Sequence, residues 1–355
     1  MKPLVSILIP AFNAQEFLAD TVRSALAQTW PRKEIIIVDD GSTDGTLTLA
    51  RQFESPEVIV VTQPNQGASM ARNTAFSLCH GEFLQWLDAD DLLAPDKITQ
   101  QMELFERGMD RRTLLSSAWG SFYYRASRAK FQENSLWCDL SPVDCMVRKF
   151  SDNVYMQTGA WLVSRELATA AGLWDPRMLI DDDGEFFSRV VLAAQGMRFV
   201  REARIMYRWT GPSSLSYLGH SRRKMEALLL SMRLQIGYLR SREDSPRVHA
   251  ACLRYLQTNL PAFYPGHPDL VAQAQQLAVE LGGQLAPVDM SWKYVLIQKT
   301  FGRNTASRVQ QYYNQQKTRV CRAYDKNMLR LEALQLWPGS GERRCLNAKT
   351  SKTRV

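Results

Sequence analysis

The sequence of 355 residues lacks three features, and each absence argues against a class of protein. It has no window close to the roughly 20 consecutive apolar residues of a transmembrane helix. Its six cysteines form no C-x-x-C pair and no zinc-site spacing with histidine, so we expect reduced, mostly structural thiols. No basic leader with a long apolar stretch and a small-residue cleavage site precedes the strand-like run Leu4–Ile9. We therefore expect a cytoplasmic protein.

The composition is that of an ordinary folded protein. Apolar residues make up 45% and charged residues 23% of the chain, which argues against disorder, collagen and disulfide-stapled miniproteins. No internal repeat of a solenoid period is present. At this length we expect one large α/β domain with a smaller appendage.

Positive charge is concentrated at the C-terminal end. Residues 290–355 contain fourteen Lys and Arg against three Asp and Glu, whereas the whole chain has a net charge of only +8. A basic tail indicates an anionic surface partner such as membrane lipid or nucleic acid, and a solvated charged face explains it equally well. The tail alone does not make a nucleic-acid-binding protein, and we expect no nucleic-acid partner.

The first hundred residues alternate short β-branched runs with segments of helical period. This alternation is typical of a parallel sheet with crossover helices. The predicted strands are Val5–Ile9, Glu34–Val38, Val58–Val61 and Glu82–Leu87, and the predicted helices are Gln15–Gln28, Thr46–Phe53 and Ala68–Leu78. Ligands of such sheets bind beyond the carboxyl ends of the strands, where this sequence has polar and acidic residues.

Later segments are mostly helical. We expect a helix from Pro95 to about Arg107, strands at Trp119–Tyr124 and Met197–Val200, and helices at Arg165–Ala171 and Glu185–Gln195. Beyond residue 219 helical periods dominate, at Ser221–Arg240, Arg247–Leu260, Asp269–Leu281 and Ser291–Tyr313. The expected domains are therefore 1–219, a helical region 220–338 and a disordered basic tail 339–355. The segment Ser291–Phe301 has the composition of an interfacial helix, which either contacts an anionic membrane or packs internally.

Two acidic clusters carry the chemistry. Asp88, Asp90 and Asp91 follow an apolar strand, where a divalent cation such as Mg²⁺ or Mn²⁺ would relieve their repulsion and share its ligands with substrate phosphates. The alternative is a solvated turn that caps the next helix. The run Asp181–Glu185 precedes a helix, so it supplies either a general base or charge that complements the helix dipole.

Five ordered segments over roughly 190 residues resemble the family-2 glycosyltransferases, which have the GT-A fold. The segments are Val5–Asn13, Ile36–Thr46, Gly67–Asn73, Asp88–Asp91 and Asp182–Arg189. The resemblance implies an α/β protein with a Rossmann-like mixed sheet flanked by helices, and the C-terminal helices form an extension of it.

The resemblance also implies residues that bind a nucleotide-sugar donor. Pro10, Phe12, Asn13 and Asp40 match the segments that border the donor base, which is uracil or another base. Arg72 matches a residue that faces the donor phosphates.

The acidic clusters have counterparts in the same family. Asp88 and Asp90 match the DxD motif, which contacts the ribose and a metal, and Asp91 is a third candidate ligand. Asp183 matches the catalytic base; its neighbour is usually Glu, whereas here it is Asp182. The implied reaction is a single in-line displacement that inverts the anomeric carbon, with Mn²⁺ or Mg²⁺ neutralising the departing diphosphate.

Two positions depart from the family pattern. Thr210 stands where members often carry a histidine near the metal, and Ile205 stands where processive synthases carry the Gln of Gln-x-x-Arg-Trp. A processive polysaccharide channel is therefore not expected. Trp161 could stack on a sugar, although a core position explains it at least as well.

The predicted function is transfer of a hexosyl or N-acetylhexosaminyl group, by default from a UDP-sugar, in the synthesis of a cell-surface polysaccharide or glycolipid. The acceptor would be a glycan, a glycolipid or a protein, and the basic C-terminal region could hold the enzyme on the inner face of an anionic membrane. A non-catalytic nucleotide-binding scaffold is the alternative from another class. A sugar-nucleotide pyrophosphorylase is disfavoured because Pro10–Asn13 is not a glycine-rich basic loop.

Overall fold

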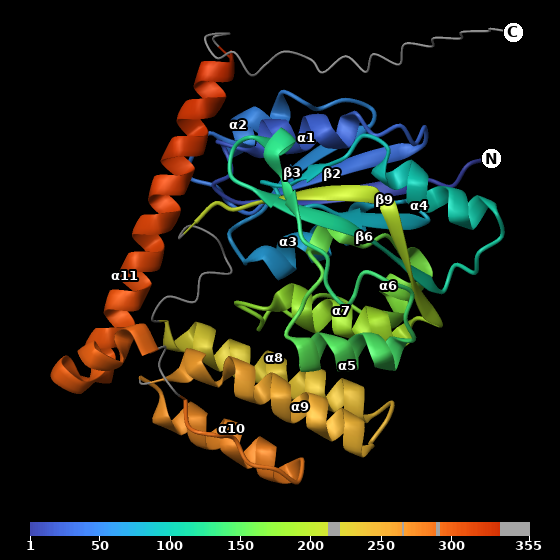
Figure 1. Cartoon of the computed structure of the whole chain (residues 1–355). Coiled ribbons are helices and arrows are strands. Elements are labelled where there is room, and N and C mark those ends of the chain that lie inside the picture. The colour runs from blue at the N-terminus through green and yellow to red at the C-terminus, as the bar shows by residue number, and fades with distance from the viewer. Residues whose placement is uncertain (212–220, 265, 289–291, 334–355) are drawn as a thin grey trace, which may run out of the picture.

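The computed structural model describes residues 1–211, 221–264, 266–288 and 292–333. Two sheets with their flanking helices form the body of the molecule, a layer of helices packs beneath them, and one long helix runs along the side (Figure 1). Residues 339–355, for which we predicted a disordered tail, lie outside the described residues. None of the described helices combines the length and the hydropathy needed to cross a bilayer.

The first sheet has the strand order β3-β2-β1-β4-β8. Its strands are β1 (Val5–Ala11), β2 (Lys33–Asp39), β3 (Val58–Thr62), β4 (Phe83–Trp86) and β8 (Val163–Ser164). The first four are parallel and correspond to the four predicted strands, whereas β8 pairs antiparallel with β4. Helices cover both faces of a parallel sheet, which explains why its central strands are continuous apolar runs.

Three crossover helices connect these strands, as predicted. They are α1 (Leu18–Leu26), α2 (Thr46–Arg51) and α3 (Ala68–Leu78). The first begins three residues later than predicted, because Gln15 is drawn into the loop before α2, where its Oε1 accepts a hydrogen bond from the Gly45 amide at 2.9 Å. Gly67 enters α3 with a φ of 90°, a conformation that favours glycine.

The second sheet has the order β5-β9-β6-β7. Its strands are β5 (Leu92–Leu93), β6 (Thr113–Phe122), β7 (Lys130–Phe131) and β9 (Gly196–Arg208). The sequence predicted short pieces of β6 and β9, but β9 is 13 residues long. Charged residues at 201, 202 and 204 interrupt the apolar pattern in the middle of β9, so the sequence does not indicate a continuous strand there. At this point the register with β6 shifts, between Ser117 and Ala118.

The remaining elements are helices and three 3-10 turns. They are α4 (Lys97–Glu106), α5 (Pro142–Asp152), α6 (Arg165–Ala171), α7 (Asp182–Ala193), α8 (Arg222–Arg240), α9 (Pro246–Asn259), α10 (Pro268–Glu280) and α11 (Trp292–Ala333), with 3-10 turns η1 (Ala126–Arg128), η2 (Thr158–Ala160) and η3 (Leu260–Phe263). Helix α5 was not predicted, although Ser141 caps it and Pro142 begins it, a recognised start signal.

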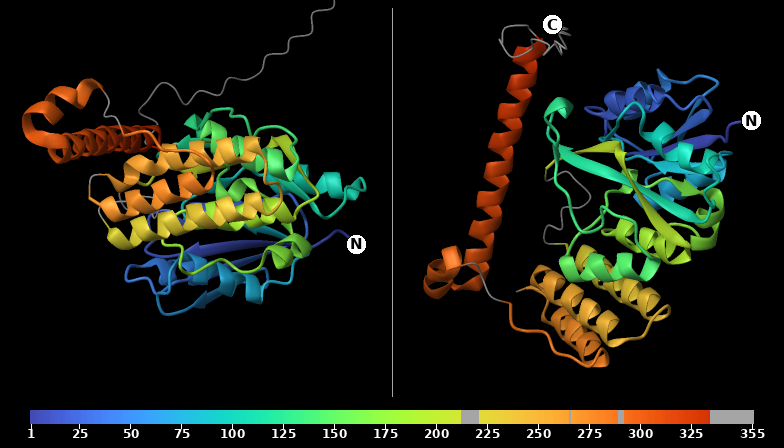
Figure 2. Two further views of the ribbon diagram at one scale, coloured as in Figure 1. Left: turned by 90° about the horizontal axis from the view of Figure 1, so that it is seen from below. Right: turned by 45° about the vertical axis from the view of Figure 1, so that its right-hand side comes forward.

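The C-terminal helices pack directly on the body of the protein. Helices α8, α9 and α10 lie side by side beneath the sheets, and α11 runs up one side (Figure 2). Met232 of α8 and Leu256 of α9 are fully buried in the same hydrophobic core as Ile7 of β1 and Phe186 of α7. The division at residue 220 stays a prediction, and the packing makes α8 and α9 neighbours of the acidic cluster.

Candidate active site

A cavity of about 890 Å³ opens beyond the carboxyl ends of β1, β2 and β4. Of the residues predicted to bind donor, metal or proton, eight line this cavity: Pro10, Phe12, Asn13, Asp40, Arg72, Asp88, Asp90 and Asp183. The ninth, Asp91, does not line it. Parallel strands that end at one edge bring these distant residues together, as expected for this sheet type.

The end of the cavity beside β1 and β2 is shaped by Asn13 and Asp40. Asn13 has a left-handed φ of 49°, and its Oδ1 accepts a hydrogen bond from the Thr43 amide at 2.8 Å. Asp40 accepts from the amides of Gln66 and Gly67, at 3.0 and 2.8 Å, and from the Gln63 side chain at 2.7 Å. Asp40 therefore holds the loop before α3 in place, and the ring of Phe12, 48% exposed, stands free at the rim.

Arg72 joins the two acidic clusters. It lies on α3, is only 4% exposed, and donates to Asp88 (Nη2 to Oδ1, 2.8 Å) and to Asp182 (Nη1 to Oδ2, 2.5 Å). Its guanidinium also stacks 4.4 Å from the ring centre of Trp174. Nearby carboxylates raise the already high pKa of Arg72, so it carries a fixed positive charge between the two clusters.

Asp90 and Asp91 are adjacent in the chain but have different surroundings. Asp90 faces the cavity, where burial, followed by the charge of Asp88, raises its pKa to about 7. Asp91 is fully buried; its Oδ1 accepts from the Arg208 amide at 2.8 Å, and its Oδ2 accepts from the side chain of Gln157. Asp91 therefore ties the end of β4 to β9 and η2, and of the three aspartates after β4 only Asp88 and Asp90 line the cavity.

The carboxylates of Asp88 and Asp90 suit a metal ion that is bound jointly by the protein and by a ligand. In the described ranges no group of three His, Cys, Asp or Glu side chains is arranged around a metal position. Asp88 and Asp90 supply two carboxylates, and burial, followed by the charge of Asp88, raises the pKa of Asp90, so a cation beside them would stabilise its ionised form. Mg²⁺ is commonly bound by one or two carboxylates together with substrate phosphates. The two aspartates fit such a shared cation.

Asp183 has the properties of a general base. It lies in the first turn of α7 and lines the cavity. Its Oδ1 accepts from the Gly184 amide at 2.9 Å, and Thr158 of η2 lies 3.5 Å from its Oδ2. Burial, followed by the charges of Asp182 and Asp181, raises the pKa of Asp183 to about 7. A base works best when its pKa lies near the working pH.

Aromatic side chains line the rest of the cavity. Trp161 is only 4% exposed and stacks on Phe187 with ring centres 5.4 Å apart, so it is largely a core residue. Tyr155 and Trp209 also line the cavity and are 48% and 46% exposed. The sequence analysis did not single out Tyr155, because a lone tyrosine between two helices carries no local signal.

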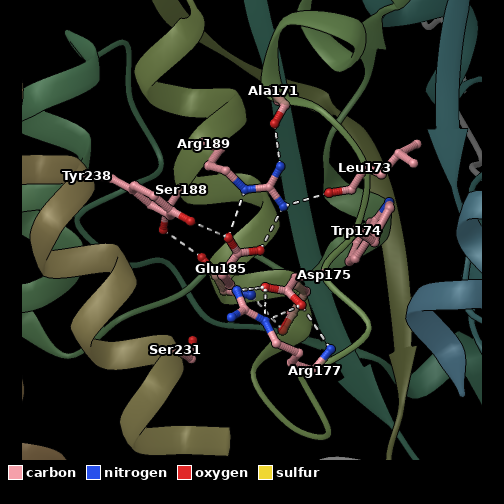
Figure 3. A network of polar contacts seen from close by, with 12 residues as sticks. Ala171, Leu173, Trp174, Asp175, Arg177, Glu185, Ser188, Arg189, Ser231 and Tyr238 are labelled. Atoms are coloured by element: carbon pink, nitrogen blue, oxygen red, sulfur yellow. Dashed lines mark hydrogen bonds and ion pairs between the residues drawn. The ribbon is translucent and has the colours of Figure 1, made fainter.

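A polar network behind the cavity fixes the start of α7 (Figure 3). Glu185 is 1% exposed, pairs with Arg189 through two hydrogen bonds of 2.8 Å, and accepts another from the Tyr238 hydroxyl of α8 at 2.8 Å. Arg189 in turn donates to the carbonyl oxygens of Ala171 and Leu173. This network joins α7 to α8 and to the loop that carries Trp174.

Comparison with known proteins agrees with this architecture. Residues 6–168 match the model of "Glycosyl transferase family 2". TuaG of Bacillus subtilis, a glycosyltransferase named for teichuronic acid biosynthesis, is 43% identical over 105 residues, which are 29% of this chain and 42% of TuaG. The chondroitin synthase of Escherichia coli is 41% identical over 109 residues, 30% of this chain and 16% of that protein. The chain thus matches less than half the length of these relatives.

A solved structure extends the likeness to most of the fold. TarS of S. aureus, residues 1–349 in complex with UDP-GlcNAc, superimposes with a TM-score of 0.65 over 78% of this chain and 81% of that chain, at 16% identity. The similarity shows that the two proteins share the GT-A fold. Residues 6–168, which contain the first sheet and the residues of the Asp88–Asp91 cluster, are thus similar in sequence to glycosyl transferase family 2.

Proposed function

We propose that the chain is an inverting, metal-dependent glycosyltransferase that moves a sugar from a nucleotide diphosphate to an acceptor hydroxyl. The observation that carries the proposal is the presence in one cavity of Asp183, whose pKa is raised to about 7, of the buried Arg72, and of the carboxylates of Asp88 and Asp90. These are the parts that such a transfer needs: a base for the acceptor and groups that hold the diphosphate.

The donor would lie along the edge formed by β1, β2 and β4. Pro10, Phe12 and the loop held by Asp40 would border its base, and Arg72 would favour the negative charge of its phosphates. Asp88 and Asp90 would hold a divalent cation, Mn²⁺ or Mg²⁺, whose chemistry is to neutralise charge on the departing diphosphate. UDP-GlcNAc bound to TarS supports a UDP-sugar, with a hexose or N-acetylhexosamine as the transferred group.

The base acts on the other side of the cavity. Asp183, ionised above its pKa of about 7, would take the proton of the acceptor hydroxyl while that oxygen attacks the anomeric carbon. One displacement inverts the anomeric configuration and needs no covalent sugar–enzyme intermediate. The ion pair of Arg72 with Asp182 would keep Asp183 at a constant distance from the donor.

The acceptor would be a glycan or a glycolipid of a cell-surface polysaccharide. Half-exposed aromatic faces suit the apolar faces of sugar rings, and Tyr155 and Trp209 present such faces beside Asp183 and Asp90. The relatives named for teichuronic acid and chondroitin support a polysaccharide product. A protein acceptor remains an outcome that an acceptor screen would reveal.

The basic C-terminal region suits a peripheral contact with an anionic membrane on the cytoplasmic side. Helix α11 exposes aromatic and apolar side chains alongside basic ones, including Tyr312, Tyr313, Val320, Lys317 and Arg319. Tyrosine and arginine are favoured at the membrane–water interface. Liposome flotation with and without anionic lipid tests this contact; recovery of the protein unbound from both would contradict it.

The experiment that tests the enzymatic function is diphosphate release from a panel of nucleotide sugars with Mn²⁺, Mg²⁺ or EDTA. We expect one donor to be turned over only with metal, and Asp90→Ala and Asp183→Asn to abolish that turnover. Turnover that survives EDTA and both substitutions would break the proposed site. Nucleotide binding without turnover of any donor, in the presence of an acceptor panel, would favour a non-catalytic scaffold.

A further inference from the structure

Asp181 is held in place by side chains of α8 and α9, which lie beyond the residues 6–168 that match the family model. It precedes α7 with a left-handed φ of 55° and lines the cavity. Its Oδ2 accepts from Ser231 Oγ and Gln235 Nε2 of α8, both at 2.7 Å, and lies 3.4 Å from the Tyr255 hydroxyl of α9. A non-glycine residue in the left-handed conformation persists only when its surroundings hold it, and here three side chains contact Oδ2 of Asp181.

Gln235 is the centre of this contact. It is fully buried, and its amide nitrogen donates to Asp181 while its Oε1 accepts from Lys149 of α5 at 2.7 Å. Lys149 also reaches the Gly184 carbonyl oxygen at 3.2 Å and Ser188 at 3.3 Å. One amide therefore bridges an aspartate and a lysine that both contact the first turn of α7.

This turn determines where Asp183 points. The Glu185 amide donates to the Asp181 carbonyl oxygen at 3.0 Å, so Asp181 begins the helix that carries the base. Asp181 Oδ1 lies 2.0 Å from where a Cβ on Gly184 would be, so the carboxylate is packed directly against the backbone beside Asp183. A shift of Asp181 would therefore move the backbone of the base.

We propose that Asp181 and Gln235 are positioning residues for the base Asp183, which makes α8 part of the catalytic machinery. The inference rests on the proposed transferase function and adds to it a role for helices that lie beyond residue 168. Displacing reacting groups by about 1 Å can cost roughly 100-fold in rate, so the bridge should affect turnover far more than donor binding.

Several other charged or titratable groups face Asp183. Asp182 lies in the same turn, Arg72 on α3 and Asp88 after β4, and the phenols of Tyr155 and Tyr255 face it from the loop after α5 and from α9. Asp181→Asn keeps all of these groups in the protein, and of them Tyr255 also contacts Asp181 itself, at 3.4 Å. The effect of the substitution on the base can therefore be read separately.

The experiment compares full-length variants with the unmodified chain in metal-supported donor turnover. Gln235→Leu removes the bridge at similar volume. Asp181→Asn removes the charge but keeps an acceptor oxygen, and asparagine tolerates a left-handed φ. The matched control is Gln257→Leu, because Gln257 of α9 also bridges two segments, through both the amide and the carbonyl of Ala286, but does not line the cavity.

We expect Gln235→Leu to lower kcat by about 100-fold while the donor KM stays within about twofold. Asp181→Asn should shift the acid limb of the kcat–pH profile to lower pH, because it removes a negative charge that disfavours ionised Asp183. A merely structural loss would lower the amount of folded enzyme and leave that limb in place.

Two results would overturn the inference. A kcat of Gln235→Leu equal to that of Gln257→Leu would show that the bridge does not position the base. An unmoved acid limb in Asp181→Asn would show that Asp181 does not act on it. Absence of turnover in the unmodified chain would instead contradict the proposed function itself, and the inference with it.

Discussion

The guanidinium of Arg72 forms an ion pair with the carboxylate of Asp182, 110 residues further along the chain, at 2.5 Å. The same guanidinium holds Asp88, so a single buried cation joins the proposed diphosphate side of the cavity to the turn that carries the proposed base. The side chain of Arg72 thereby fixes the distance between Asp88 on one side of the cavity and Asp182 on the other.

Replacement of Arg72 should destabilise the protein strongly. Arg72→Met leaves Asp88 and Asp182 without their shared cation, and loss of one partner of a buried pair costs about 3–5 kcal/mol. Urea unfolding at neutral pH measures the change. Arg177→Met, which breaks an ion pair whose arginine is 64% exposed, is the control and should leave stability nearly unchanged. Equal stability of both variants would contradict the bridging role of Arg72.

Turnover should depend on ionisation of Asp183. Because the pKa of Asp183 is raised to about 7, turnover should rise as the pH increases through about 7, where the carboxylate loses its proton. Asp183→Asn should lower kcat by about 10²–10⁴-fold without weakening nucleotide binding. Asp152→Asn, at an exposed position on α5, is the control. A kcat that is independent of pH between 5 and 8, values that bracket that pKa by roughly one to two units, would argue against this base.

The raised pKa of Asp183 also predicts how stability varies with pH. The folded state binds this proton more tightly than the unfolded chain does, so stability is fully present below pH 3.8 and is lost as the pH rises through about 7. Asp183→Asn has no such carboxylate and should not lose this stability. The loss in the unmodified protein is at most about 1.4 kcal/mol for each pH unit by which the folded-state pKa exceeds the unfolded-state pKa. In EDTA the stability of Asp183→Asn relative to the unmodified protein should therefore increase from pH 4 to pH 7. A constant difference in urea unfolding would contradict the assignment.

Substitutions of Asp90 and Asp91 should differ in their effect on the metal concentration that turnover requires. Asp90→Asn removes a carboxylate that faces the cavity, so the Mn²⁺ concentration for half-maximal turnover should rise at least about tenfold. Asp91→Asn is the matched neighbour; it alters a buried contact with Arg208 and Gln157 and should lower the melting temperature with little change in metal dependence. The reverse pattern would place the metal at Asp91.

Helix α11 should support the cavity through Asp325. This residue accepts from the amides of Tyr124 and Arg125, at 2.8 and 3.1 Å, and pairs with the Arg125 side chain at 2.7 Å. Next to it, Arg322 donates to the carbonyl oxygen of Thr210, which lines the cavity. Asp325→Ala leaves Arg125 partly unpaired, at about 1–3 kcal/mol, so local opening should increase several-fold.

Limited trypsin digestion measures that opening, since α11 is rich in Lys and Arg, and we also expect a higher donor KM for Asp325→Ala. Glu133→Ala, which breaks the exposed ion pair with Arg201, is the control. Cleavage of both variants at the rate of the unmodified protein would show that Asp325 does not anchor the helix.

Local patterns in the sequence were sufficient to predict the four parallel strands of the first sheet, but not the short antiparallel strand β8. The strands β1 to β4 are short apolar runs bounded by turn residues, and α3 begins and ends at the predicted residues Ala68 and Leu78. The positions of Asp40 and Asp88 follow from the same pattern, since a residue that ends a parallel strand must lie at the edge of the sheet. Helix α5 was missed although Ser141 and Pro142 signal its start, because the flanking sequence is mixed in character.

Which atoms of the acidic residues remain free could not be predicted in this way. Asp88, Asp90 and Asp91 are equivalent as a sequence motif. In the structure, however, both carboxylate oxygens of Asp91 accept hydrogen bonds from distant residues: Gln157, 66 positions along the chain, and Arg208, 117 positions along it. The full length of β9 could not be predicted either. The charged residues in its middle interrupt the strand pattern in the sequence, and they lie where the register with β6 shifts, a feature that exists only in the paired strands.

The sequence by itself determined the family resemblance, the four parallel strands of the first sheet and the chemical types at their carboxyl ends, because these depend on neighbours within a few residues. The tertiary structure alone decided that Arg72 joins Asp88 to Asp182, that Tyr155 rather than Trp161 presents an exposed ring, and that Gln235 holds Asp181. Burial, charge balance and hydrogen-bond partners arise from contacts between segments far apart in the chain, and a linear pattern does not encode which of those contacts form.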